Sequence, residues 1–115
     1  MLQDFLERIN NAQAVDFAET MAVINQYYHY QPVNFSNGVH QPIVNTAGTN
    51  EGSCKIFAFA KIHQLNQAQT LALFGDFYRH DVLGHPDATD HQNIRTFMRD
   101  GWDGVVFTAE ALTAK

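Results

Sequence analysis

The sequence predicts a mainly α (α+β) fold, a small single-domain bundle of five or six short helices with a small β-hairpin element. The chain has 115 residues, close to the commonest size of a single domain. Apolar residues make up 45% of it, with nine Phe and four Tyr among them, which is enough to build a buried core. They recur at helical spacing in most segments, whereas Pro and Gly interrupt that spacing in region 30–50. We therefore expect residues 1–115 to form one domain.

Two helices are expected before the interrupted region. In the first, apolar residues three or four positions apart share one face of a helix that ends near Asn10: Leu2, Phe5, Leu6 and Ile9. In the second, Asp16 and Glu19 have the spacing of a capping box, in which two side chains satisfy free N–H groups at a helix start. Met and aromatic residues follow at helical spacing to about Tyr28, a pattern typical of a buried face.

Region 30–50 is predicted to contain a hairpin. Asn37 and Gly38 stand between two apolar runs, and an Asn-Gly pair in that setting favours a tight hairpin turn. Pro32 and Pro42 lack the backbone N–H group that a central strand needs, so the pairing of residues 32–44 should be edge-like. The β-branched run at residues 105–107 is expected to pair with this hairpin.

The central helix is expected in the stretch CKIFAFAKIHQL. Ser53 precedes it as the predicted N-cap, and its apolar residues occur on most sides, so the helix should be buried. Asn66 and Gln69 then repeat the capping-box spacing before another helix, which Gly75 should interrupt.

The last helix is predicted to begin at Thr89 or Asp90 and to end at Gly101, which would act as its C-cap. Gly84 and Pro86 separate it from the preceding helix. Its buried face should consist of Ile94, Phe97 and Met98.

Charge and composition exclude several classes of function. Seven Lys and Arg residues against twelve Asp and Glu give a net charge of −5, which a nucleic-acid backbone would repel, so no nucleic-acid partner is expected. The longest apolar run, at residues 56–60, is far shorter than the roughly 20 residues that span a bilayer, so no membrane insertion is expected. The single cysteine and the absence of a secretory signal at the start indicate a cytoplasmic protein.

Much of the chain resembles the HopJ type III effector family. The similar stretches are NEGSCKIFAFAKIHQL, FGDFYRHDVLGHPDATDHQNIRTFMRDGW and the terminal EALTAK, and the strings NEGSCKIFAFAK and TDHQNIR are the most specific. The resemblance implies a bacterial protein that is delivered into a host cell and has a host or bacterial protein partner. It implies no activity, catalytic residue or cofactor. The leading prediction is a HopJ-like protein that binds a protein or a small ligand.

Cys54 supports an enzyme as the alternative. It falls in the first turn of a predicted helix, where free N–H groups and the helix dipole favour a thiolate, and His80, His85 or His91 could serve as its base. This reading predicts a Cys54-dependent hydrolase or transferase. The opposing interpretation is core packing, because the thiol shares an apolar stripe with Ala58, Ile62 and Leu65.

A metal-binding protein is the third prediction. The densest polar cluster of the sequence contains residue types that bind zinc, iron or nickel: His80, Asp81, His85, Asp90 and His91. No HExxH or comparable spacing accompanies them, so a solvated loop in which Asp90 caps the last helix is the competing interpretation.

An anion site is predicted on the last helix. His91, Arg95 and Arg99 are spaced four apart, which places them on one helix face where they could hold a phosphate or a carboxylate. A solvated charged face is the alternative interpretation of the same spacing.

Overall fold

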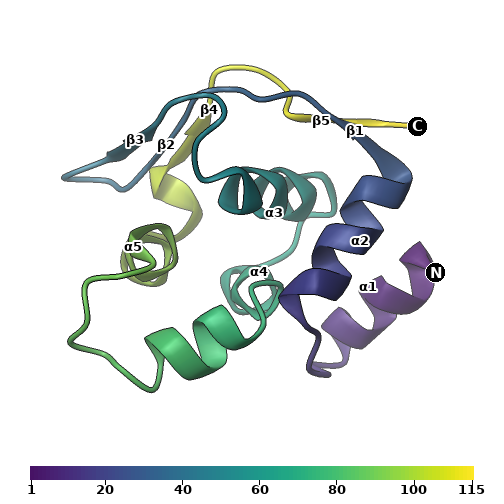
Figure 1. Cartoon of the computed structure of the whole chain (residues 1–115), viewed down its shortest axis with the longest axis horizontal. Helices are drawn as coiled ribbons and strands as arrows, with labels where there is room; N and C mark the ends of the chain where they lie inside the picture. Colours follow the sequence, from purple (N-terminus) through teal and green to yellow (C-terminus); the bar gives the residue numbers. More distant parts are fainter.

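Helix α3 (Glu51–Ile62) lies at the centre of the structure, a computed structural model that describes residues 1–115 (Figure 1). Its residues 56–60 are buried, as the sequence predicts, because the other elements surround it. Helices α1 (Leu2–Asn10) and α2 (Phe17–Tyr27) pack on one side of it and α5 (Gln92–Asp100) on the other, with α4 (Gln67–Ala72) between them and the strands across the top (Figure 1).

Helices α1 and α2 form where the apolar spacing predicts them, but the predicted capping box of α2 is absent. Asp16 is the N-cap, yet its side chain accepts no hydrogen bond from the first turn. Glu19 instead pairs with Arg8 of α1, since the two helices lie side by side and bring the charges together. Glu19, which was predicted to cap α2, therefore forms an ion pair that joins α2 to α1.

The predicted hairpin is confirmed, with a different turn. Strands β2 (Phe35–Asn37) and β3 (Ile43–Asn45) pair antiparallel, and β4 (Val105–Phe107) pairs with the other edge of β2, as expected. Asn37 is not in the turn but is the buried last residue of β2, because its amide bonds to Asn93 of α5. The connection is the longer segment 38–42, which begins at Gly38 with a φ of +128°.

A second, two-stranded sheet was not predicted. Strand β1 (Tyr28–Tyr30) continues directly from α2 and pairs antiparallel with β5 (Leu112–Ala114) near the end of the chain. Each strand has three residues, too few for an alternating pattern to distinguish it from the adjoining helix or loop.

The segment from Asn66 to Gly101 confirms three further predictions. The capping box of α4 is complete, since Asn66 Oδ1 accepts from the Gln69 N–H at 2.8 Å and Gln69 Oε1 accepts from the Asn66 N–H at 2.9 Å. Gly75 breaks the helix at a φ of +61°, where an added Cβ would lie 2.6 Å from the Phe17 nitrogen. A π-helix follows at Phe77–Val82, and α5 ends at Gly101 as predicted before a 3-10 turn, Gly101–Gly104.

The fold class is therefore α+β, mainly helical with small antiparallel sheets. No helix combines the length and the apolar character that crossing a bilayer requires.

Candidate functional site

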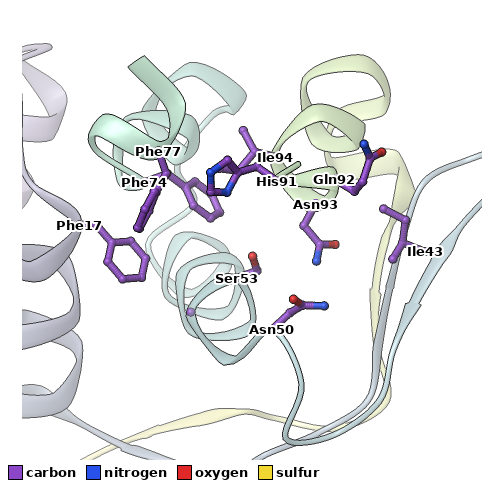
Figure 2. A pocket seen from close by; sticks show the side chains of 11 residues that line it. Phe17, Ile43, Asn50, Ser53, Phe74, Phe77, His91, Gln92, Asn93 and Ile94 are labelled. Carbon is purple, nitrogen blue, oxygen red and sulfur yellow. The ribbon is translucent and has the colours of Figure 1, made fainter. Parts of the chain in front are cut away.

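A cavity of about 350 Å³ lies where the first turns of α3 and α5 face α2 and the π-helix (Figure 2). Part of its wall is apolar and mostly aromatic, formed by Phe17, Ile43, Phe74, Phe77 and Ile94. The other part carries amide, hydroxyl and imidazole groups together with one glycine, from Asn50, Gly52, Ser53, His91, Gln92 and Asn93. No Asp, Glu, Lys or Arg lines the cavity, so its interior combines hydrogen-bonding groups with apolar surface and has His91 as its one titratable side chain.

Both helix starts at the cavity differ from their predictions. Asn50, not Ser53, is the N-cap of α3, so the Ser53 hydroxyl lies inside the first turn and lines the cavity. His91, not Thr89 or Asp90, is the N-cap of α5. Asn50 and His91 adopt left-handed conformations, with φ of 50° and 51°, and each helix begins at the next residue.

Neither helix start is closed by a side chain. The Asn50 and His91 side chains make no capping hydrogen bond. The N–H groups of the first helical turn have no partner within a helix, and no protein group accepts from those of residues 52–53 or 93–94. These donors and the helix dipoles favour an oxygen acceptor in the cavity.

A buried network of asparagine amides joins the two helix starts to the sheet. Asn93 Nδ2 donates to Asn45 Oδ1 at 2.9 Å, and Asn93 Oδ1 accepts from Asn37 Nδ2 at 3.1 Å. Asn50 Nδ2 also donates to Asn45 Oδ1, at 2.8 Å, which connects α3 to the same group. This network was not predicted, because Asn37 was expected in a turn and Asn45 and Asn93 had no expected role.

Three of the predicted site residues meet beside the cavity. Asp81, in the π-helix, accepts from His91 Nε2 at 3.1 Å through one oxygen and from His80 Nδ1 at 3.1 Å through the other. These two hydrogen bonds, that from His80 first, lower the pKa of the Asp81 carboxyl and keep it ionised. The Phe77 ring packs on the His91 ring with their centres 5.2 Å apart.

The remaining members of the predicted metal cluster, His85 and Asp90, lie at the edge of the group formed by His80, Asp81 and His91. His85 approaches only the His80 ring, at 6.0 Å between ring centres, and Asp90 lies 3.8 Å from His91 Nε2. No group of three or more His, Cys, Asp or Glu side chains is arranged to hold a metal ion. The metal site stays a prediction, which elemental analysis of protein purified without an affinity tag would test.

Cys54 is packed in the core. Its side chain is 1% exposed, and burial raises the pKa of the thiol above its ordinary value. Its hydrogen-bond partners are the Tyr30 hydroxyl and the Val33 backbone, and no histidine bonds to it. Ala58 and Leu65 share its buried face, whereas Ile62, expected on the same stripe, is 47% exposed. A catalytic role for Cys54 therefore stays a prediction without a neighbouring base in the structure.

The two arginines of the predicted anion site are already paired. Arg95 donates to Asp90 Oδ1 at 2.8 Å and to the carbonyl oxygen of the same residue at 2.7 Å. Arg99 binds both carboxylate oxygens of Asp100, and this contact, with a hydrogen bond from the Val39 N–H, lowers the pKa of Asp100 to about 2. An added anion would have to displace these carboxylates.

Comparison with known proteins connects the chain to one family. The profile of the family described as HopJ type III effector protein matches residues 2–112. A crystal structure described as that of the unknown-function protein VPA0580 superposes with a TM-score of 0.95 at 49% identity, covering 100% of this chain and 94% of that one. The comparison with curated proteins found no match. The chain belongs to the HopJ type III effector protein family.

Proposed function

We propose that this HopJ family protein binds a small organic molecule in the cavity between the first turns of α3 and α5. The proposal rests on one observation: the two sequence strings that resemble the family most specifically line the same cavity. Residues 50–53 come from the string NEGSCKIFAFAK and residues 91–94 from TDHQNIR, and both segments line this one cavity. Segments far apart in the chain thus supply its polar side together.

The lining indicates the chemistry of the ligand. The Phe17, Phe74 and Phe77 rings offer apolar contact, while the open N–H groups and the Ser53 hydroxyl offer donors to an oxygen acceptor. No lysine or arginine is present to neutralise a multiply charged group. The cavity volume lies within the range of small-molecule sites, roughly 300 to 1,000 Å³. We infer a compact ligand with an apolar body and a carbonyl-type oxygen.

A second cavity, between α3 and β5, fits this role less well. Its volume is about 420 Å³, but most of its lining consists of small side chains and the aliphatic surface of Ile62 and Leu112. No buried polar network supports it, in contrast to the asparagines behind the first cavity. We use it as an internal control.

Binding of benzamide, benzoate and phenyl acetate tests the proposal, because these probes share one apolar ring and differ in charge and acceptor group. Saturation-transfer NMR on the full chain measures their affinity. We expect binding that Ser53→Leu weakens about tenfold or more by filling the cavity, equivalent to about 1.4 kcal/mol. Thr113→Leu, which adds a similar side chain beside the second cavity, should bind as the unchanged protein does. Equal affinities of the two variants would contradict the proposal.

We also infer, from the family description alone, that the protein is delivered into a host cell and has a host or bacterial protein partner. A translocation reporter fused to the full chain tests delivery. The reporter signal should appear in host cytoplasm and should be lost when the secretion system of the producing bacterium is inactivated. A signal that is the same in both strains would argue against delivery by that route.

A further inference from the structure

The Asp81–His91 contact leaves one imidazole nitrogen unused. An ionised carboxylate accepts hydrogen bonds and donates none, so the His91 Nε2 that lies 3.1 Å from Asp81 Oδ2 carries the proton of the neutral ring. The other nitrogen, Nδ1, then holds a lone pair and makes no hydrogen bond to the protein. The side chain is 28% exposed, and the ring lies among the residues that line the cavity (Figure 2).

We propose that His91, oriented by Asp81, is the general base that activates a water molecule for hydrolysis of a small acyl ester bound in the cavity. This inference rests on the proposed ligand-binding function and adds a reaction to it. A carboxylate that fixes the tautomer and direction of an imidazole is a recurring device for such a base.

Water is the nucleophile in this proposal, since no hydrogen bond joins Ser53 to His91 and Cys54 is buried. His91 Nδ1 takes one proton from the water as the water oxygen bonds to the ester carbonyl carbon. The resulting tetrahedral intermediate carries a negative charge on the former carbonyl oxygen. The bond to the alcohol oxygen then breaks, and that oxygen takes the proton from His91. One water and one ester give one acid and one alcohol, and His91 is restored.

The opposite wall of the cavity supplies donors for the negative charge of the intermediate. The N–H groups of Gly52 and Ser53 have no protein acceptor, and Figure 2 shows the Ser53 hydroxyl directed toward the part of the cavity that holds the His91 ring. Fixed donors aimed at a developing oxyanion are a major source of transition-state stabilisation. These donors and His91 line the same cavity, whose volume of about 350 Å³ can hold a small acyl group.

The lining selects the class of ester. The aromatic wall suits an apolar acyl group, and the absence of lysine and arginine disfavours a phosphorylated substrate. Two carboxylates face His91, Asp81 from the π-helix and Asp90 from the segment before α5, so an anionic substrate would also meet repulsion on that side.

Hydrolysis of p-nitrophenyl acetate, butyrate and hexanoate by the full chain tests this proposal. The informative variant is His91→Asn, because asparagine tolerates the left-handed conformation that His91 adopts. We expect saturable hydrolysis of at least one ester and a fall in kcat of about 100-fold or more in His91→Asn. His29→Gln, which replaces an exposed histidine on β1, should leave kcat unchanged.

Asp81 is a positioning residue, so its variants need a different readout. Asp81→Asn should lower kcat about tenfold or more with KM unchanged, and Asp81→Glu should restore part of the loss. Circular dichroism confirms that each variant is folded, and His91→Gln replaces His91→Asn should the latter fail that test.

Three results would overturn the proposal. These are hydrolysis of every ester no faster than with an equal concentration of free imidazole, the same kcat in His91→Asn and the unchanged protein, and an acyl group found on Ser53 or Cys54 by mass spectrometry. Binding of benzamide that Ser53→Leu weakens, combined with any of these results, would leave the binding function standing and remove only the hydrolysis.

Discussion

The start of α4 differs from the starts of α3 and α5 in whether a side chain accepts from the free N–H groups of the first helical turn. Asn66 and Gln69 close the start of α4 with a reciprocal capping box. Asn50 and His91 begin α3 and α5 in left-handed conformations, without any side-chain cap, and the N–H groups behind them remain open at the cavity. A left-handed non-glycine residue costs roughly 1 to 2 kcal/mol. The start of α2 also lacks a side-chain cap, but its N-cap, Asp16, has an extended backbone. The combination of a left-handed N-cap and open N–H groups occurs at the two helix starts of the cavity, as expected of a functional site.

The buried amides compensate for the open helix starts. Asn93 is 7% exposed and bonds to both Asn37 and Asn45, while Asn50 bonds to Asn45. The strands therefore hold the helix starts in place, which leaves the first-turn N–H groups free for a ligand.

The largest effect should come from Asn93→Ala. It removes three buried hydrogen bonds, one to Asn37 Nδ2 and one to each polar atom of the Asn45 side chain, and each is worth about 1 kcal/mol net. Each of the three atoms keeps one other partner. We expect a loss of about 3 kcal/mol or more in the free energy of unfolding, measured by equilibrium urea denaturation. Asn25→Ala, which removes one exposed hydrogen bond to Lys55, should stay within about 0.5 kcal/mol. A loss below about 1 kcal/mol for Asn93→Ala would show that the network does not hold the helix starts.

Adjacent residues of α3 supply the second prediction, because Ser53 lines the cavity and Cys54 is buried. A thiol with a raised pKa and no access should react slowly with a small disulfide reagent in the native protein and rapidly after denaturation. Cys54→Ser should cost roughly 1 to 3 kcal/mol by burying a hydroxyl, and Cys54→Ala should cost less. Ser53→Cys is the matched control and should react quickly in the native state. Fast modification of native Cys54 would restore the nucleophile interpretation.

The sequence predicted the elements whose signals are local. The apolar spacing of α1, the capping box of α4, the break at Gly75 and the end of α5 at Gly101 all depend on neighbouring residues, and all are confirmed. The pairing of residues 105–107 with the hairpin was also predicted, because a β-branched run needs a partner strand.

Both helix starts with wrongly predicted N-caps lie at the cavity, whereas the unpredicted β1–β5 sheet lies outside it. Ser53, Thr89 and Asp90 are good N-caps by residue type. The observed N-caps are instead Asn50 and His91, whose left-handed conformations the apolar and capping patterns did not indicate. The sequence named His91 and Asp81 as site residues, yet only the fold shows that the carboxylate orients the imidazole. The network of Asn37, Asn45 and Asn93 was not predicted, because a buried amide network has no spacing rule along the chain.

The third prediction concerns the capped start of α4. Asn66→Ala removes the acceptor for the Gln69 N–H and should cost about 1 kcal/mol in thermal or urea denaturation. It should leave benzamide affinity unchanged, because Asn66 does not line the cavity. Weaker benzamide binding in Asn66→Ala would mean that the two kinds of helix start are coupled.

The smallest effect is expected at the far end of α3. Tyr28 donates its hydroxyl proton to His63 Nε2 at 2.6 Å, and burial lowers the pKa of His63 below its ordinary 6.5 while it raises that of Tyr28. The unfolded chain therefore binds a proton at His63 more readily than the folded protein does. Neutral His63 contributes fully to the free energy of unfolding above pH 6.5, and this contribution declines as the pH falls below 6.5. His63→Gln should flatten that part of the stability profile. An unchanged profile would show that His63 is not the titrating group.

Ligand binding at the open helix starts can be measured by a benzamide titration of uniformly nitrogen-15-labelled protein, followed by the backbone amide signals. We expect the largest shifts at Gly52, Ser53, Asn93 and Ile94, the open first turns of α3 and α5, while the capped start of α4 at residues 67–69 stays unchanged. Shifts that concentrate at α4 or in the cavity beside β5, or no shifts at saturating benzamide, would contradict this expectation.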